Sequence, residues 1–199
     1  MRILIFAAGP IKRGWTESAP KQLALIEGRP LILRTLDQLG EREAVVVTHN
    51  EAIQRAVPVF FDPPAHRWWA ETLLSTISLW KERTTVLNGD VVFSPEALRA
   101  IMDSKSDIRF YGTKDEAFGV TFVKRHWEKV IASAKQAVDY NTAVKKCLVW
   151  HFYRAFNGLP LDGHTHNPDA YQVAPLDDYT IDIDSVRRYK KFLEANTWA

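Results

Sequence analysis

The chain has 199 residues, of which 46% are hydrophobic and 25% are charged, so it can fold into one domain with a packed core. The formal net charge is only +2 and no long basic block occurs, which disfavours nucleic acid as a partner but leaves room for a local anion site. The single cysteine, Cys147, excludes an intramolecular disulfide and a zinc site of several thiolates. No apolar run is long enough to span a membrane. We therefore expect a cytoplasmic protein that acts without a membrane.

The first half of the chain alternates between strands and helices. Residues 2–7 are β-prone and continuously apolar from Ile3 onward, as in a strand buried on both faces, and apolar residues recur at helical spacing between Gly28 and Gly40. The elements predicted next are a strand at 44–48, a short helix at 50–56, a strand at 58–61, a helix at 70–81, a strand at 84–88 and a helix that starts at Ser94-Pro95. This alternation predicts an α/β fold, a three-layer αβα sandwich with a mostly parallel central sheet.

The pattern changes after residue 105. The predicted elements are neighbouring strands at 108–111 and 118–123, helical residues rich in aromatic side chains at 124–156, a loop at 157–175, a late strand at 179–183 and a final basic helix at 185–196. Because no linker or repeat separates these elements from the first half, they are predicted to belong to the same domain.

A long polar loop follows the first strand. The sequence FAAGPIKRGWTESAPKQL at residues 6–23 holds three cations, Lys12, Arg13 and Lys21. A loop that only joined two elements would be about half as long. Neither GxxxxGK[ST] nor GxGxxG occurs here, which excludes a usual P-loop and disfavours a dinucleotide Rossmann site. A triphosphate held by backbone N–H groups and side-chain cations remains as the ligand that this loop favours.

The same stretch resembles the opening signature of the nucleotidyltransferase superfamily with a GT-A-like fold, in which AAGxGxR leads to Pro-Lys. Two later stretches agree with this resemblance. Val-Leu-Asn-Gly-Asp at 86–90 looks like that family's strand ending in a metal-binding aspartate, and Tyr-Thr-Ile-Asp-Ile-Asp-Ser at 179–185 is similar to its closing strand. The resemblance covers residues 1–100 and 177–196. The nearest branches are the nucleotidyltransferases of sugar-1-phosphates and phosphocholine and the MobA-like NTP transferases.

The resemblance implies which residues form the site. Those that it places around the nucleotide are Ala7, Ala8, Gly9, Arg13, Lys21, Asn88 and Gly89. Arg13 and Lys21 would be the catalytic cations on the phosphates. Asp90 and Asp184 would bind Mg²⁺, the expected cofactor. Asp182 shares a strand face with Asp184, so it is kept as an alternative or supporting ligand.

The resemblance also implies the reaction. A nucleoside monophosphate would pass from an NTP to a small phosphorylated acceptor, a sugar-1-phosphate or a phosphocholine-like molecule, with release of pyrophosphate. In a single domain, 1–199, the nucleotide-binding half would be 1–104, the acceptor-binding insertion 105–176, and the closing strand and helix 177–199. The NTP and the acceptor are the expected partners, and a homodimer is left open. Two other functions stay open, a GT-A-like glycosyltransferase that uses a nucleotide-sugar and a non-catalytic nucleotide-binding subunit.

Several candidate residues also have a purely structural interpretation. Asp90 fits a turn after the strand, and Asp184 fits a cap of the last helix. His164 and His166 fit a surface loop better than a metal site, because they fall in a segment rich in Gly, Pro and Asn. Trp68-Trp69 either lines the pocket or covers the sheet. A further group of aromatic residues either cages a quaternary ammonium or belongs to the core, namely Trp127, Tyr140, Trp150, Phe152, Tyr153 and Phe156.

Overall fold

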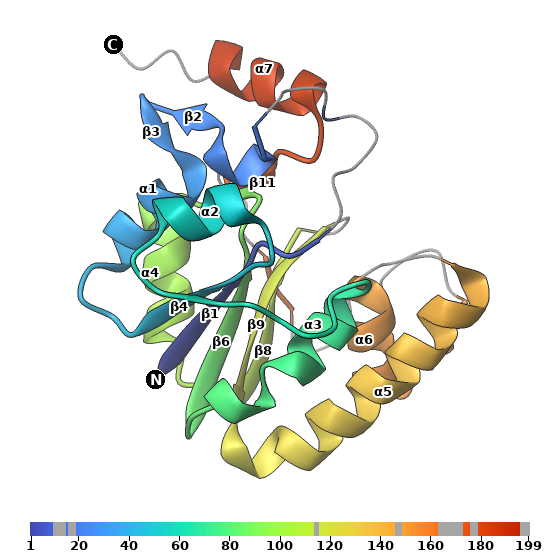
Figure 1. The fold of residues 1–199 in the computed structure, drawn as a ribbon. Helices are drawn as coiled ribbons and strands as arrows, with labels where there is room; N and C mark the ends of the chain where they lie inside the picture. The colour runs from blue at the N-terminus through green and yellow to red at the C-terminus, as the bar shows by residue number, and fades with distance from the viewer. Residues whose placement is uncertain are drawn as a thin grey trace.

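Strand β1 (Arg2–Phe6) lies in the middle of a sheet that has helices on both of its faces (Figure 1). The computed structural model describes residues 1–9, 15, 19–113, 116–145, 149–162, 173–175 and 179–195. The other strands are β2 (Leu25–Ile26), β3 (Arg29–Pro30), β4 (Ala44–Val47), β5 (Phe60–Phe61), β6 (Arg83–Asn88), β7 (Val91–Val92), β8 (Ile108–Gly112), β9 (Ala117–Val123), β10 (Val173–Pro175) and β11 (Ile181–Asp182). The helices are α1 (Leu31–Leu39), α2 (Glu51–Ala56), α3 (Trp69–Ser75), α4 (Pro95–Asp103), α5 (Trp127–Val144), α6 (Val149–Phe156) and α7 (Val186–Ala195), with 3-10 turns η1 (Lys21–Leu23), η2 (Ile77–Leu79) and η3 (Lys124–His126).

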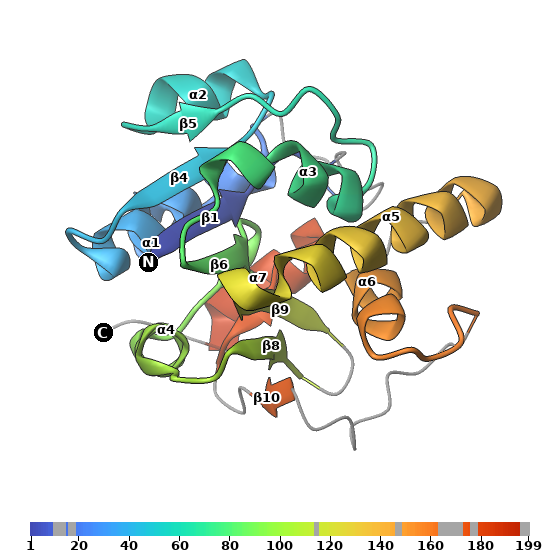
Figure 2. The same cartoon turned by 90° about the horizontal axis from the view of Figure 1, so that it is seen from below.

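Seven strands form the central sheet, in the order β10-β8-β9-β6-β1-β4-β5. β1 pairs in parallel with β4 and with β6, and the edge strands β5 and β10 also pair in parallel with their neighbours. β9 runs antiparallel to both β6 and β8. Figure 2 shows the three layers from below, with α1 and α4 on one side of the sheet and α3, α5 and α6 on the other. The predicted αβα sandwich with a mostly parallel sheet is confirmed.

The apolar run of β1 supplies both faces of the sheet. Ile3 and Ile5 belong to the core cluster formed with α1, α2 and α4. Leu4 and Phe6 belong to the cluster formed with α3, α5 and α6. Successive side chains of a strand point to opposite faces, so a strand covered by helices on both sides is apolar at every position.

A third apolar cluster lies beyond the carboxyl ends of the strands. Its buried members are Trp15, Ile26, Leu31, Val92, Ile183 and Phe192. They join the β2–β3 hairpin to α7, which lies at the top of Figure 1. β7 and β11 pair antiparallel in a two-stranded sheet of their own. The predicted late strand is therefore shorter than 179–183 and lies outside the central sheet.

The helices differ from the prediction in two places. The helical stretch predicted at 124–156 is divided into α5 and α6, because Lys145 ends α5 in the left-handed conformation, with φ of 52°. The helix predicted at 70–81 ends at Ser75, and the chain passes through η2 to an extended Trp80. None of the described helices is both long enough and apolar enough to cross a membrane.

Residues after 105 contribute to the central sheet as well as to its helical cover. β8, β9 and β10 extend the sheet on one side, and only afterwards does the α5–α6 hairpin pack on its face. β2, β3, β7 and β10 were not predicted, because a strand of two or three residues has too few positions to show an alternating pattern.

Candidate active site

Three loops meet at the carboxyl edge of the sheet, which is the upper edge in Figure 1. β1, β4 and β6 run parallel, and Phe6, Val47 and Asn88 lie side by side at their ends. The N–H of Ala7 donates to the carbonyl of Val47 at 2.8 Å, and the N–H of Gly89 donates to the carbonyl of Phe6 at 2.8 Å. The predicted residues after β1, Ala7 to Gly9, and after β6, Gly89 and Asp90, therefore lie at the same edge.

Gly89 lies closer to β1 than a larger residue would allow. A Cβ atom at Gly89 would lie 3.0 Å from the carbonyl oxygen of Phe6 and 3.3 Å from the Cβ of Ala7. Because the nearest of these atoms belongs to the backbone, glycine is the residue that fits without moving a strand end. Gly9 differs, since it is exposed and a Cβ there would meet no described atom within 4 Å. Gly89 thus fixes the point at which Asp90 leaves the sheet.

Lys21 and Asp90 form an ion pair across this edge, although 69 positions separate them in the sequence. The Nζ of Lys21 donates to Oδ2 of Asp90, and the two side chains are 7% and 18% exposed. Pro20 directly precedes η1 and places Lys21 at the first position of that turn. The structure therefore brings together the lysine of the Pro-Lys motif and the candidate metal ligand.

A second group of charges lies beside the Asp90 loop. The N–H of Ile183 donates to the carbonyl of Asp90 at 3.0 Å and continues the pairing of β7 with β11, so Asp184 follows directly. Arg188 on α7 forms an ion pair with Glu116, and its Nε lies 3.7 Å from Oδ1 of Asp184. The hydrogen bond to Glu116 raises the pKa of Arg188 above its ordinary value, and the charge of Asp184 acts in the same direction. The guanidinium therefore stays charged beside Asp184.

The donor set at this edge suits an ion of the magnesium type. Asp90 and Asp184 offer carboxylate oxygens, which are the hard ligands that such an ion prefers. Among the residues that the structure describes, no three carboxylate, imidazole or thiol groups converge into a closed cage. Magnesium is usually held by one or two carboxylates and takes its other ligands from phosphate and water. The ammonium of Lys21 also shows that a cation fits against Asp90.

Asn88, the last residue of β6, is held at both ends of its side-chain amide. Its Oδ1 accepts from Nε1 of Trp69 at 2.9 Å, and its Nδ2 donates to the carbonyl of Ala117 at 2.9 Å. The ring of Trp69 packs on Phe6 and Phe152, with ring centroids 5.3 and 5.4 Å apart. An amide oxygen and an amide nitrogen each offer two hydrogen-bonding positions, so these contacts do not use the whole capacity of Asn88. Trp69 covers the sheet with its ring and reaches the candidate site with its N–H.

The aromatic residues of the helical hairpin are divided between core and edge. Trp68 is buried, and its Nε1 donates to Oγ1 of Thr142 on α5 at 3.2 Å, so this end of α5 lies at the carboxyl edge. Three of the six aromatic candidates belong to the core, Phe152, Tyr153 and Phe156. The other three are half-buried, Trp127, Tyr140 and Trp150. Trp127 follows the end of β9 at the amino edge, so a role in ligand binding at the carboxyl edge narrows to Tyr140 and Trp150.

Two histidines at the same edge were not predicted as site residues. His49 follows β4, and its ring stacks on that of His66 with centroids 3.8 Å apart. Partial burial lowers the pKa of His49 below its ordinary value, and His66 acts in the same direction while Asp62 opposes it. The signal for His49 in the sequence was its place directly after a buried strand.

Some predicted residues lie outside the residues that the structure describes. These are Lys12, Arg13, Cys147, His164 and His166. The phosphate-binding role of Arg13 therefore stays a prediction, as does the surface-loop interpretation of the two histidines.

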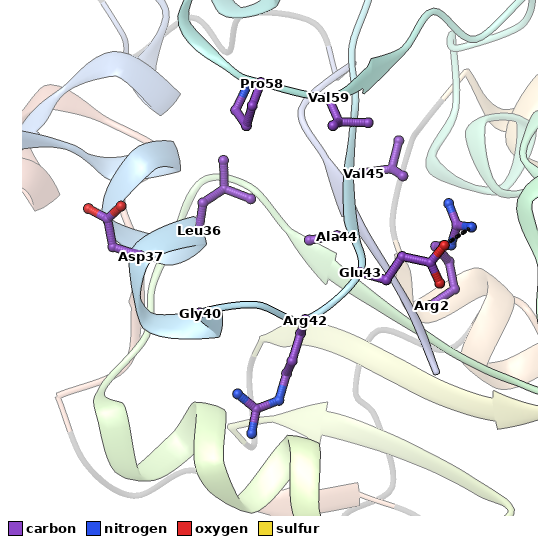
Figure 3. Close-up of a pocket in the computed structure, with 10 residues that line it drawn as sticks. All are labelled: Arg2, Leu36, Asp37, Gly40, Arg42, Glu43, Ala44, Val45, Pro58 and Val59. Carbon is purple, nitrogen blue, oxygen red and sulfur yellow. Dashed lines mark hydrogen bonds and ion pairs between the residues drawn. The ribbon is translucent and has the colours of Figure 1, made fainter.

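A cavity of about 750 Å³ lies at the opposite, amino edge of the sheet (Figure 3). Leu36 on α1, Val45 on β4 and Val59 before β5 lie around it, and the paired Arg2 and Glu43 lie at its margin. Because the candidate residues lie at the other ends of the same strands, this cavity is not part of the candidate site.

The fold defines the class of protein. A mostly parallel αβα sandwich with this strand order is a GT-A-like nucleotidyltransferase fold. The family model of the MobA-like NTP transferase domain matches residues 3–151, and the chain belongs to this family. The predicted enzyme class, a nucleotidyltransferase, is thereby confirmed. Among curated protein sequences, none matches this chain.

Several solved structures share the fold over nearly the whole chain. The CTP:phosphocholine cytidylyltransferase LicC from Streptococcus pneumoniae is 17% identical, with 98% of each chain covered and a TM-score of 0.62. HddC from Yersinia pseudotuberculosis, solved with GMP-PN, is 14% identical, with 98% of each chain covered and a TM-score of 0.59. Rv0371c from Mycobacterium tuberculosis, solved with manganese, is 16% identical, with 98% of each chain covered and a TM-score of 0.58. At such identities the similarity shows the fold and not the substrate.

Proposed function

We propose that this protein transfers a nucleoside monophosphate from an NTP to a small phosphorylated acceptor and releases pyrophosphate. The observation that carries the proposal is the contact of Lys21 with Asp90 at the carboxyl edge, with Asp184 on the neighbouring segment. An acceptor phosphate oxygen would attack the α-phosphorus, and the bond from that phosphorus to the bridging oxygen of the β-phosphate would break. Pyrophosphate would leave with the bonding electrons. The acceptor supplies the nucleophile, so no nucleophilic side chain is required.

The main requirement of this reaction is positive charge, because two anions must approach each other. Lys21 and Arg13, both from the loop after β1, are proposed to bind the phosphates. The backbone at Ala7, Ala8 and Gly9 and the turn Asn88-Gly89 are proposed to face the nucleotide, since these residues end or directly follow strands that finish at the same edge.

Asp90 and Asp184 are proposed to hold a divalent ion, with Mg²⁺ as the candidate. When bound, the ion would supply positive charge to the phosphate oxygens. The manganese in the structure of Rv0371c supports a divalent ion in this fold. Asp182, two residues before Asp184 and paired with Val91, is kept as a supporting group.

The acceptor is proposed to bind between the Asp90 loop and the carboxyl-edge end of the α5–α6 hairpin. Tyr140 and Trp150 are half-buried there, and the ring of Tyr140 lies 4.9 Å from that of His151 on α6. The substrate named for LicC, phosphocholine, supports including a quaternary-ammonium acceptor beside sugar-1-phosphates. We also propose a cytoplasmic location, because a single cysteine fits a reducing compartment.

The function is tested by pyrophosphate release. The purified protein is mixed with Mg²⁺ and ATP, CTP, GTP or UTP, each with sugar-1-phosphates or phosphocholine. Release that requires both an NTP and one acceptor is the expected result. Transfer from a ready-made nucleotide-sugar would show a glycosyltransferase instead. NTP binding without turnover for any pair would show a non-catalytic nucleotide-binding subunit.

Replacing Trp69 with phenylalanine should lower turnover about 10-fold, since the ring stays in place while the hydrogen bond to Asn88 is lost. The same change should lower the free energy of unfolding by about 1 kcal/mol, the usual net value of one hydrogen bond. Steady-state kinetics and thermal unfolding measure the two effects.

Trp80→Phe is the matched control for Trp69→Phe. The Nε1 of Trp80 donates to Oγ1 of Thr76 at 3.1 Å in the core, before β6 begins. We expect a similar loss of stability with normal turnover. Equal losses of turnover in both variants would show that the bond from Trp69 to Asn88 has no particular function in catalysis.

Trp150→Leu should raise the KM of the acceptor roughly 10-fold, as expected for loss of a cation–π or polar contact, and leave NTP affinity unchanged. Tyr153, which is 0% exposed and packs edge-on against Trp150, is the comparison position. Tyr153→Leu should instead lower the free energy of unfolding by about 1–3 kcal/mol without a selective effect on the acceptor. Unchanged acceptor KM in the Trp150→Leu variant would place the acceptor elsewhere.

A further inference from the structure

Each carboxylate proposed to bind the divalent ion already has a cation of the protein beside it. Lys21 pairs with Asp90, and Arg188 lies 3.7 Å from Asp184. The two cations are held differently. The side chain of Lys21 is 7% exposed and reaches Asp90 through its ammonium. Arg188 is fixed by three partners, Glu116, Asp184 and the carbonyl of Asp182.

We propose that Lys21 is a placeholder cation for the metal position at Asp90. In the free protein its ammonium neutralises Asp90. When an NTP binds, the ammonium moves from Asp90 to the phosphates and leaves the carboxylate to the divalent ion. This inference rests on the proposed function. It gives Lys21 two positions, one on Asp90 in the free protein and one on the phosphates of the bound NTP, and the Pro-Lys motif alone predicts only the second.

The charges of Lys21 and Asp90 lie in a poorly hydrated place. A lysine ammonium and a divalent ion that share one mostly buried carboxylate repel each other, because the like charges lie within a few ångströms of each other. An aspartate without any cation there would also be costly, so some cation is needed in the free protein. A triphosphate carries more negative charge than one carboxylate and therefore competes well for Lys21.

The chemistry of the two side chains decides which cation moves. Lysine is a point charge on a flexible stem, so its ammonium can change partners without a change in the backbone. Arginine is a planar fork, and the fork of Arg188 is shared between Glu116 and Asp184. We infer that Arg188 stays and acts as a positioning residue for Asp184 while Lys21 moves. Phosphate binding and metal binding then favour each other, and this coupling is reciprocal.

The first test measures binding of Mn²⁺ alone, with no nucleotide, by the electron paramagnetic resonance signal of the free ion. Lys21→Met keeps an unbranched side chain that is one atom shorter and removes the charge. We expect at least a 10-fold gain in Mn²⁺ affinity over the wild type, because the competitor for Asp90 is gone. The gain should disappear in the double variant Lys21→Met/Asp90→Asn. Lys124→Met removes an exposed lysine that pairs with Glu82 at 3.2 Å, and it should leave Mn²⁺ affinity unchanged.

The second test measures binding of inorganic tripolyphosphate in the presence of a chelator, so that no metal takes part. Asp90→Asn should strengthen this binding in the wild-type background, where it releases Lys21. In the Lys21→Met background, Asp90→Asn should strengthen tripolyphosphate binding clearly less. Loss of the negative charge alone would act equally in both backgrounds, so the difference between them measures the transfer of Lys21 from Asp90 to the phosphates.

The results can contradict the placeholder role of Lys21 and the proposed nucleotidyl transfer independently of each other. Mn²⁺ affinity within twofold of the wild type in Lys21→Met would overturn the placeholder, even if pyrophosphate release proceeds normally. A gain in Mn²⁺ affinity in a protein that releases no pyrophosphate with any NTP and acceptor would support the placeholder and contradict the proposed function. If Lys21→Met fails to fold, Lys21→Gln is measured in the same way and judged by the same limits.

Discussion

Turnover is expected to fall at least ~100-fold when Asp90 is replaced by asparagine, because the substitution keeps the size of the side chain but removes the charge proposed to hold the divalent ion. The fold should persist, since the side chain lies at the sheet edge and is 18% exposed. Rates of pyrophosphate release and thermal unfolding are the measurements.

Asp37→Asn is the control for the Asp90 substitution. It also removes a carboxylate from an ion pair, that of Asp37 on α1 with Arg29 on β3 at 2.8 Å, but this pair is exposed. We expect normal turnover and a change in stability below about 0.5 kcal/mol. Near-normal divalent-dependent turnover in Asp90→Asn would contradict the role proposed for Asp90.

Removing the charge of Lys21 should have the next largest effect. In Lys21→Met we expect kcat/KM for the NTP to fall about 10- to 100-fold, the equivalent of one hydrogen bond between charged groups. The loss should appear in NTP affinity and in turnover together, because the charge is needed both before and during transfer. A change confined to the KM of the acceptor would place Lys21 in the acceptor pocket instead.

Much of the fold was predictable because several elements are long and regular. The apolar run Ile3–Phe6 of β1, the helical spacing of α1 and the Ser94-Pro95 start of α4 each leave a clear pattern, and Ser94 does cap α4 through a bond from the N–H of Ala97. The short strands β2, β3, β7 and β10 left none. β7 has only two residues, and its pairing with β11 depends on contacts between distant segments.

The candidate site divides in the same way. Lys21 belongs to the Pro-Lys motif and Asp90 ends the Val-Leu-Asn-Gly-Asp stretch, so both could be predicted from the sequence alone. Arg188 and Glu116 could not, because they lie 72 positions apart and neither stands in a motif. Their interaction exists only once α7 has packed beside the β8–β9 connection. Trp69 was identified as a pocket or cover residue and Asn88 as a nucleotide-binding residue, but the hydrogen bond between them could not be predicted.

The packing of α7 on the loop after β1 has a consequence for the order of events during synthesis. Tyr189 donates from its hydroxyl to the carbonyl of Leu25 at 2.8 Å across 164 positions, and its ring lies 5.8 Å from that of Trp15. Translation proceeds from the N-terminus, so the segment that carries Lys21 leaves the ribosome long before α7 is made. The parallel core of β1, β4 and β6 can pair first, whereas the cover over Trp15 closes only when the last helix emerges. A nascent chain released before α7 would therefore carry Trp15 and Lys21 and still lack the helix that covers Trp15.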